Sequence, residues 1–373
     1  MFIPGFIKDV PHLQLPLLPN SWLSGDAGHG MSTPLWLPYD DGLILSRKGL
    51  LSAHGFDLST QLWSQPVDEW PNPVDYKNNV FIDVHRRKVM GFDRRTGKEL
   101  CAVPIPVDSF LYAVSESGPI ISHRNKDLYV FEAFDWSGKS LWRHGTFGSV
   151  IPTPGICLIR ENLGESLAAL DESSGELRWR FSAPKTGDRG PGDISNEISS
   201  GLPSVIALED RVIVTVFDGR VFSLDRKKGE VLSQGQTPVN GSFQVTTTSI
   251  FFAQPFCFSE FDHQEMREIS RLEYREEVEP LYGRHARTMN AFCFSEESIV
   301  WTTMHGALMG ISRKASPTGK RITWVNQKTD VLMPVATPPL IWGGYLYFRQ
   351  MAASTNTPCG LLCYRSSNEH DLT

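Results

Sequence analysis

The chain has 373 residues, 40% of them hydrophobic and 21% charged, which is typical of a folded globular protein with a sizeable core. Its net charge of −6 gives no electrostatic footprint for nucleic acid, whose binding needs a basic stripe, so we expect no nucleic-acid partner. No stretch approaches the roughly 20 apolar residues of a membrane-spanning helix, so we expect no membrane insertion. The 31 glycines and 25 prolines are spread along the chain and predict a fold with many tight turns.

Residues 1–30 form an N-terminal segment without the basic start, long apolar run and cleavage site of an export signal. This pattern predicts a cytoplasmic chain with reduced thiols. Residues 11–18, Pro-His-Leu-Gln-Leu-Pro-Leu-Leu, are a candidate β-strand that could close a ring by pairing with the end of the chain.

A repeated unit is the strongest signal in the chain. It consists of an apolar strand, a turn that starts at Asp and ends at Gly, and a second strand. The best copies run from Asp93 to Gly97, from Asp171 through Gly175 to Trp179, and from Asp225 to Gly229. The Asp carboxylate can accept N–H groups of the turn, and Gly supplies the positive φ that such a turn needs.

Weaker copies fill the intervals, so that turns start near positions 57, 93, 135, 171, 225, 262 and 314. These steps match the length of a four-stranded propeller blade. Four tryptophans lie on the strand after a turn and are predicted to pack between one blade and the next, namely Trp63, Trp142, Trp179 and Trp324.

The sequence therefore predicts one all-β domain over 1–373, a β-propeller of four-stranded antiparallel blades. Seven turns give seven blades, and three further strands after residue 330 lack a fourth partner. The N-terminal strand can supply it, which removes an exposed sheet edge. We expect eight blades closed by that strand, with seven as the alternative.

The run Leu170-Asp171-Glu-Ser-Ser-Gly175-Glu-Leu-Arg-Trp179 resembles the tryptophan-docking repeat of the pyrroloquinoline-quinone-like propeller superfamily, whose blades are WD40-like. The resemblance implies this fold over most of the chain. The superfamily includes quinone-dependent alcohol dehydrogenases, a lipoprotein of the outer-membrane assembly machinery and protein-binding members. The dehydrogenases use a vicinal Cys-Cys pair, which the six separated cysteines here do not form. We therefore expect no cofactor, and the scattered histidines predict no metal site.

Two insertions between repeats, 184–201 and 260–287, are candidates for function because propeller loops vary freely on a rigid scaffold. The first is rich in Gly and lacks a phosphate-loop ending. The second alternates acidic and basic residues. Their charged residues are the predicted partner contacts: Asp188, Arg189, Asp193, Glu197, Glu273, Arg275, Glu276 and Glu277.

No catalytic motif stands out, so the leading hypothesis is a non-catalytic scaffold, monomeric apart from its partner, that binds another protein. One specific form is a cytoplasmic immunity protein that neutralises a bacterial toxin. The alternative is a propeller enzyme with a site at the channel mouth, either a metal-dependent hydrolase or a quinone-dependent oxidoreductase.

Overall fold

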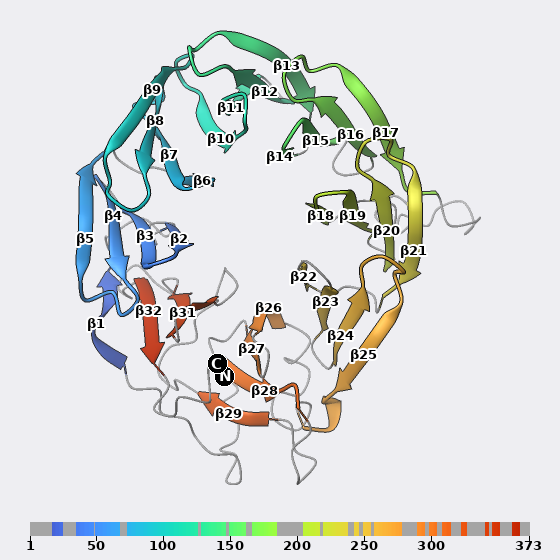
Figure 1. Cartoon of the computed structure of the whole chain (residues 1–373). Helices are drawn as coiled ribbons and strands as arrows, with labels where there is room; N and C mark the ends of the chain where they lie inside the picture. Colours follow the sequence, from blue (N-terminus) through green and yellow to red (C-terminus); the bar gives the residue numbers. More distant parts are fainter. Residues whose placement is uncertain are drawn as a thin grey trace.

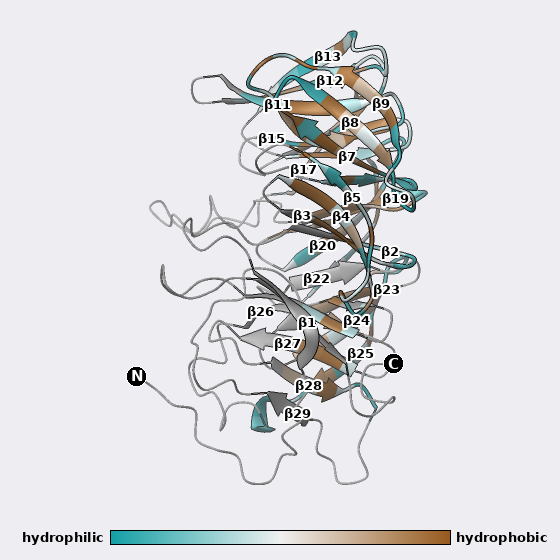
Figure 2. Cartoon of the chain, turned by 90° about the vertical axis from the view of Figure 1, so that its left-hand side faces the viewer, coloured by the Kyte–Doolittle hydropathy of each residue, from teal (hydrophilic) through white to brown (hydrophobic). Residues whose placement is uncertain are grey.

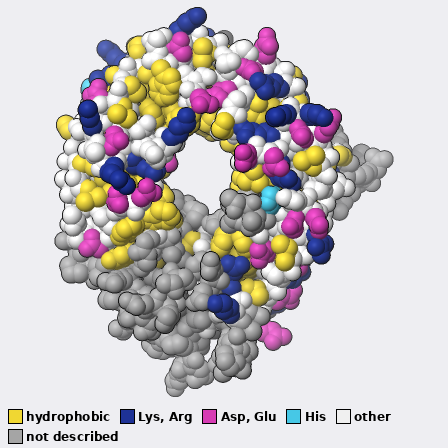
Figure 3. Space-filling model, viewed as in Figure 1, with side chains coloured by type: hydrophobic (Ala, Val, Ile, Leu, Met, Phe, Trp, Pro, Cys, Tyr) yellow, Lys and Arg dark blue, Asp and Glu magenta, His cyan; other side chains and the backbone are white. Residues whose placement is uncertain are grey.

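The computed structural model describes residues 17–24, 35–47, 49–67, 73–125, 128–146, 149–161, 166–184, 204–216, 219–237, 242–245, 249–254, 257–277, 289–294, 298–303, 308–314, 322–326, 340–342, 345–350 and 360–365. These residues form four-stranded antiparallel sheets arranged as a ring around a central opening (Figures 1 and 3). The prediction of an all-β propeller is confirmed.

Seven of the sheets are built from consecutive strands. In chain order their strands are β2 (Leu35–Tyr39), β3 (Gly42–Arg47), β4 (Leu50–Gly55), β5 (Gln61–Pro66); β6 (Val74–Tyr76), β7 (Asn79–Val84), β8 (Lys88–Asp93), β9 (Glu99–Pro104); β10 (Phe110–Val114), β11 (Pro119–Asn125), β12 (Leu128–Phe134), β13 (Ser140–Thr146); β14 (Val150–Thr153), β15 (Ile156–Glu161), β16 (Ser166–Asp171), β17 (Leu177–Ser182); β18 (Ser204–Ala207), β19 (Arg211–Thr215), β20 (Arg220–Asp225), β21 (Val231–Gln236); β22 (Ser242–Val245), β23 (Ser249–Gln254), β24 (Cys257–Asp262), β25 (Glu268–Glu273); and β26 (Met289–Phe294), β27 (Ser298–Thr303), β28 (Leu308–Ser312), β29 (Ile322–Asn326).

One further sheet joins the two ends of the chain. It contains β30 (Leu340–Trp342), β31 (Tyr345–Gln350), β32 (Gly360–Arg365) and the N-terminal strand β1 (Leu17–Ser24), in the order β1-β32-β31-β30. The ring is thus closed by an N-terminal strand, as predicted, but that strand lies at 17–24 where the sequence predicted 11–18. Trp22, Leu23 and Ser24 pair with consecutive residues of β32, and unlike Pro16 each has an N–H to donate to the ladder. Residues 11–16 lie outside the described part of the chain.

The hydrophobic core lies between neighbouring sheets. One cluster joins Leu158 and Trp179 of the β14–β17 sheet to Val214 and Phe222 of the β18–β21 sheet, and all four side chains are buried. Such cross-sheet packing fits strands that are buried on both faces, because each sheet covers the next one around the ring.

The Asp turns have the predicted geometry. The Asp171 carboxylate accepts the backbone N–H groups of Ser173 and Ser174 at 3.0 and 2.9 Å. Hydrogen bonds from the Ser173 hydroxyl and Arg178 hold the pKa of Asp171 well below its usual range. Gly175 closes the turn with a φ of +72°. The repeated Asp and Gly therefore mark a turn whose hydrogen bonds and backbone conformation are supplied by residues within the turn itself.

The three docking tryptophans whose side chains the structure describes pack on the turn of the next sheet, as predicted. The Trp142 indole N–H donates to the Glu172 carbonyl at 2.8 Å, and a Cβ added at Gly175 would lie 2.3 Å from the Trp142 Cβ. The same contact recurs between Trp63 and Gly97 and between Trp179 and Gly229. The side chain of Trp324 lies outside the described part.

In two sheets the residue after the turn Asp bridges to a neighbouring sheet, which the sequence analysis did not anticipate. Glu172 is buried, and its carboxylate accepts the backbone N–H of Ser117 at 3.0 Å and that of Gly155 at 2.7 Å. The two N–H donors belong to the β10–β11 turn and the β14–β15 turn, which are in neighbouring sheets. The carboxylate thereby ties one sheet to the next at the rim.

At the corresponding position of the β18–β21 sheet stands Arg226. Its guanidinium donates to the Glu209 carbonyl at 2.9 Å and to the Thr153 hydroxyl at 3.0 Å, and it also reaches the Pro154 carbonyl. A carboxylate at 172 and a guanidinium at 226 thus both link neighbouring sheets, because the backbone of a turn offers N–H donors to the first and carbonyl acceptors to the second.

In each of the seven sheets built from consecutive strands, the pairing between the third strand and the fourth, outer strand contains a register shift. A bulge of this kind twists a strand locally and protects an exposed sheet edge from pairing with another chain. In five sheets the residue at this shift is Leu or Ile: Leu62, Leu100, Leu141, Leu232 and Ile269.

Two sides of the ring follow from the strand directions. We call the side with the turns at Asp93, Asp171 and Asp225 the Asp-turn side, and the side where β15 ends at Glu161 and β17 ends at Ser182 the connection side. Figure 2 shows hydrophilic turns gathered along one side of the ring. In the part of the chain that the structure describes, no helix is long and apolar enough to cross a membrane.

Candidate functional site

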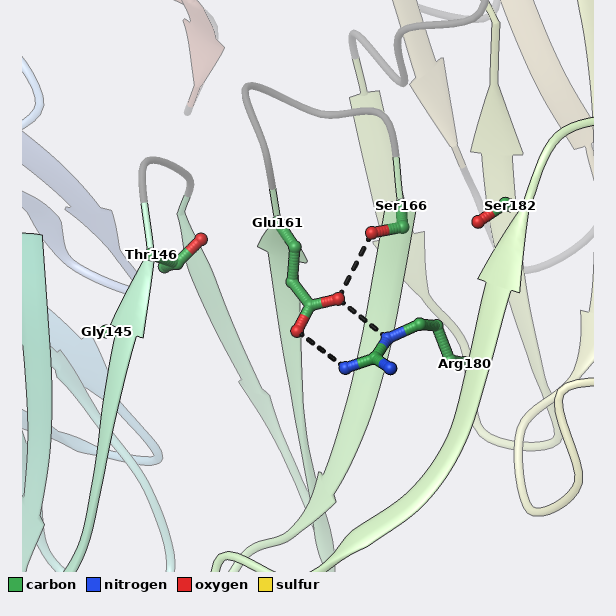
Figure 4. Close-up of a pocket in the computed structure, with 6 residues that line it drawn as sticks. All are labelled: Gly145, Thr146, Glu161, Ser166, Arg180 and Ser182. Atoms are coloured by element: carbon green, nitrogen blue, oxygen red, sulfur yellow. Dashed lines mark hydrogen bonds and ion pairs between the residues drawn. The ribbon is translucent and has the colours of Figure 1, made fainter. Parts of the chain in front are cut away.

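A polar pocket of about 410 Å³ opens on the connection side between two sheets (Figure 4). Gly145 and Thr146, at the end of β13, form one wall. The β14–β17 sheet forms the other wall with Glu161, Ser166, Arg180 and Ser182. The pocket is therefore a cleft between adjacent blades, made by three strands of one sheet and the outer strand of its neighbour.

Glu161 is the centre of this pocket. It is 9% exposed and accepts hydrogen bonds from Arg180 at 2.8 and 3.0 Å, one to each carboxylate oxygen, and from the Ser166 hydroxyl at 3.1 Å. The His144 Nε2 lies 3.4 Å from Oε1 of Glu161. The buried carboxylate is thus surrounded by donors, as a buried charge requires.

Register explains why these side chains meet. Glu161 pairs with Ser166 and Ser166 with Ser182, so the three share one face of the sheet at its end. Arg180 stands two residues before Ser182 in β17 and therefore projects from the same face. The bidentate geometry of Arg180 and Glu161 fixes both side chains.

The electrostatics of the pocket favour the charged state of the pair. Burial alone would raise the pKa of Glu161, but hydrogen bonds from Arg180 and Ser166 and the charge of Arg180 outweigh it, so the pKa is lowered. The bond to Glu161 in turn raises the pKa of Arg180. Half of the Arg180 side chain remains exposed, so the pocket presents a fixed cation to solvent.

The arrangement does not have the order of a catalytic triad. In a triad the histidine stands between the hydroxyl and the carboxylate, and it accepts the proton of the nucleophile. Here Glu161 stands between Ser166 and His144 and accepts from the hydroxyl directly. The geometry suits recognition of a polar or charged group, and within the described ranges no cluster of three or more His, Cys, Asp and Glu could hold a metal ion.

The predicted partner contacts that the structure describes do not line this pocket. Four of them, Asp188, Arg189, Asp193 and Glu197, lie outside the described residues. The connection that contains them starts after β17, at the end of the strand where Ser182 lines the pocket.

The other four predicted residues lie at and after the end of β25, two sheets away from the pocket. Glu273 is exposed and lies 3.8 Å from Arg271, and Arg275 and Glu276 are exposed in a short helical turn. Glu277 is different, because its carboxylate accepts the backbone N–H of Ile322 at 2.9 Å and so joins this turn to β29.

The segment 260–287 was predicted to be an insertion, and this is wrong for its first part. Residues up to Glu273 form the hairpin of β24 and β25, a regular part of the ring. Met266 occupies the glycine position of that turn with a φ of +54°. The missing glycine explains why the copy of the repeat at position 262 is weak in the sequence.

Sequence reasoning missed Glu161 and Arg180. The available signal was a charged residue at the end of the apolar run from Ile156 to Glu161, where burial forces a carboxylate to find a partner. Its partner stands 19 residues later, and only the strand register identifies it.

Comparisons with known proteins agree with the architecture. The family model described as outer membrane protein assembly factor BamB matches residues 124–250, which include every residue of the pocket. No curated protein matches the chain.

Solved structures share the fold at low identity. BamB from Moraxella catarrhalis superposes with a TM-score of 0.56 at 14% identity, over 92% of this chain and 99% of that one. The computationally designed Ika8 protein gives 0.56 at 13% identity, over 92% and 98%. A europium-containing methanol dehydrogenase gives 0.56 at 11% identity, over 90% and 85%.

These proteins differ in what their names describe, so the likeness concerns the fold and leaves the function to be argued from the site. The docked tryptophans and the shared architecture show that the chain is a β-propeller, and over residues 124–250 it is similar to the pyrroloquinoline-quinone-like repeat family of BamB.

Proposed function

We propose that this propeller is a non-catalytic scaffold that binds another protein on its connection side. The observation that carries the proposal is the pocket between β13 and the β14–β17 sheet, where buried Glu161 holds Arg180 half exposed in one orientation. An arginine fixed in advance loses little freedom when it binds, and arginine is enriched among residues that dominate protein interfaces.

Two further points support a protein partner. The family model that spans the pocket is described as an assembly factor. In addition, the long connection after β17 starts beside the pocket, and loops on a rigid ring are where propellers add binding residues.

Affinity capture of the full chain from native lysate, with cross-linking and mass spectrometry, tests the proposal. We expect a stoichiometric protein whose cross-links fall on the connection side. Arg180→Ala should weaken its capture, while Lys228→Ala, which removes an exposed cation from the Asp-turn side, should leave it unchanged. A chain that captures no protein, or equal loss in both variants, would refute the proposal.

A narrower form of the proposal is a cytoplasmic immunity protein whose partner is a bacterial toxin. It rests on the sequence reasoning above, and the capture experiment decides it by the identity of the partner. The enzyme alternative makes a separate prediction. A quinone titration that shows saturable binding with a shifted absorption spectrum would favour a quinone-dependent oxidoreductase over a scaffold.

A further inference from the structure

Most exposed large hydrophobic side chains among the residues that the structure describes fall into two sets. The two others, Trp136 and Trp342, each donate an indole N–H to a backbone carbonyl. One set lies on outer strands, at or beside the register shifts: Leu62, Leu100, Leu177, Val231, Leu232 and Ile269. These are single residues, one or two to a sheet, set apart around the circumference. Isolated apolar residues on a surface need no partner to explain them.

The second set is concentrated on one sheet, the β10–β13 sheet and the segment leading into it. Val107, Phe110, Tyr112 and Tyr129 are all exposed, with exposed fractions of 61%, 45%, 38% and 49%. The repeat does not require exposed aromatic residues at these positions. Three exposed aromatic rings on two strands of one sheet form a local patch, and such patches mark interaction sites.

Basic side chains stand beside this patch. The turn between β7 and β8 places His85 and Arg86 at φ values of +52° and +51°, in the left-handed region that residues other than glycine rarely adopt. The turn presents Arg86 so that its guanidinium carbon lies 4.3 Å above the centre of the Phe110 ring. Arg86 and Arg87 are exposed, and neither forms an ion pair with a residue in the described part of the chain.

The patch continues into the pocket. The Tyr112 ring contacts the Phe131 ring at 4.9 Å, Phe131 pairs in register with His144, and His144 lies 3.4 Å from Glu161. Tyr129 pairs with Thr146, which lines the pocket. Arg86, Phe110, Tyr112, Tyr129 and Arg180 thus lie toward the connection side of three neighbouring sheets, and we call this set of residues the cation–aromatic track.

We propose that the cation–aromatic track binds an acidic peptide segment with apolar or aromatic anchors, contributed by the partner protein. This inference rests on the proposed function and specifies the chemistry of the partner. Carboxylates of the segment pair with Arg86 and Arg180, and its apolar side chains pack on the exposed rings between them. Charge complementarity selects an acidic occupant, because Arg86 and its neighbour Arg87 are exposed cations without an ion pair to a described residue, and the Arg180 side chain is half exposed.

Fluorescence anisotropy with a labelled short peptide that alternates Glu with Trp tests this inference on the full chain. A peptide of equal length with Lys in place of Glu and a thymidine oligonucleotide are the comparison probes. We expect the acidic peptide to bind, and Arg86→Glu and Phe110→Ser each to weaken it about tenfold or more. Both side chains are exposed, so the variants should fold, and circular dichroism checks this.

Lys228→Glu is the matched control, since it makes the same change in charge on the opposite side of the ring and should leave binding unchanged. The inference is overturned if the acidic peptide does not bind, if the Lys peptide or the oligonucleotide binds as tightly, or if Arg86→Glu has no larger effect than the control. Those results would leave the proposed function standing as long as the native capture yields a partner. If affinity capture from native lysate yields no partner protein, the proposed function itself is refuted.

Discussion

Trp142 packs directly on Gly175, so adding one methyl group at Gly175 tests how much this contact between two sheets contributes to stability. Gly175→Ala would place its Cβ 2.3 Å from the Trp142 Cβ and 2.6 Å from its Cγ, at a φ of +72°. The left-handed conformation costs an alanine about 1–2 kcal/mol. Inserting a methyl group into a packed contact costs about a further 1–3 kcal/mol. We expect the variant to lose about 2–5 kcal/mol of unfolding free energy.

Gly155→Ala is the control, because Gly155 has a φ of +79° and nothing lies within 4 Å of an added Cβ. It should lose only the conformational part, about 1–2 kcal/mol. Urea unfolding followed by tryptophan fluorescence measures both variants. If Gly175→Ala is no less stable than Gly155→Ala, Trp142 does not hold the two sheets together in the way that the geometry indicates.

Three other properties can be tested on the same footing. Arg226→Met should lower the free energy of unfolding by about 1–3 kcal/mol, because it leaves turn carbonyls of two sheets without donors; Lys227→Met should have almost no effect, and equal urea midpoints would contradict the bridging role. Glu161 has a lowered pKa, so its contribution to stability is complete above the ordinary value of about 4.3 and is lost as the pH falls through the folded value. The stability difference between the wild type and Glu161→Gln should therefore be constant near neutral pH and shrink in acid; a difference unchanged down to about pH 3 would show that the ion pair does not stabilise the fold. Burial raises the pKa of the Cys157 thiol, so a thiol reagent at neutral pH should label it only after unfolding, and rapid labelling of the native protein would show that this strand is accessible.

The repeat could be predicted from the sequence because its parts interact over a few residues. Asp171, Gly175 and Trp179 stand at fixed spacing, and each has a local reason for its identity: an acceptor for turn N–H groups, a positive φ, and a wide side chain for the gap between sheets. Where one part is replaced, as Met266 replaces the glycine, the same backbone forms but the pattern weakens.

The pocket could not be predicted in this way. Glu161 and Arg180 belong to strands that are separated by β16, and His144 belongs to another sheet. Their meeting depends on strand register, in which a slip of one residue would turn each side chain to the opposite face. The bridge from Glu172 to Ser117 is hidden for the same reason, since it joins turns 55 residues apart.

Hydrogen–deuterium exchange of the full chain, alone and with its captured partner, tests the binding side most directly. The proposal predicts slower exchange of residues 84–88, 110–112, 128–131, 144–146 and 179–182, all on the connection side, when the partner is bound. Slower exchange confined to the turns at 93–97, 171–175 and 225–229 would place the partner on the Asp-turn side and contradict the proposed function.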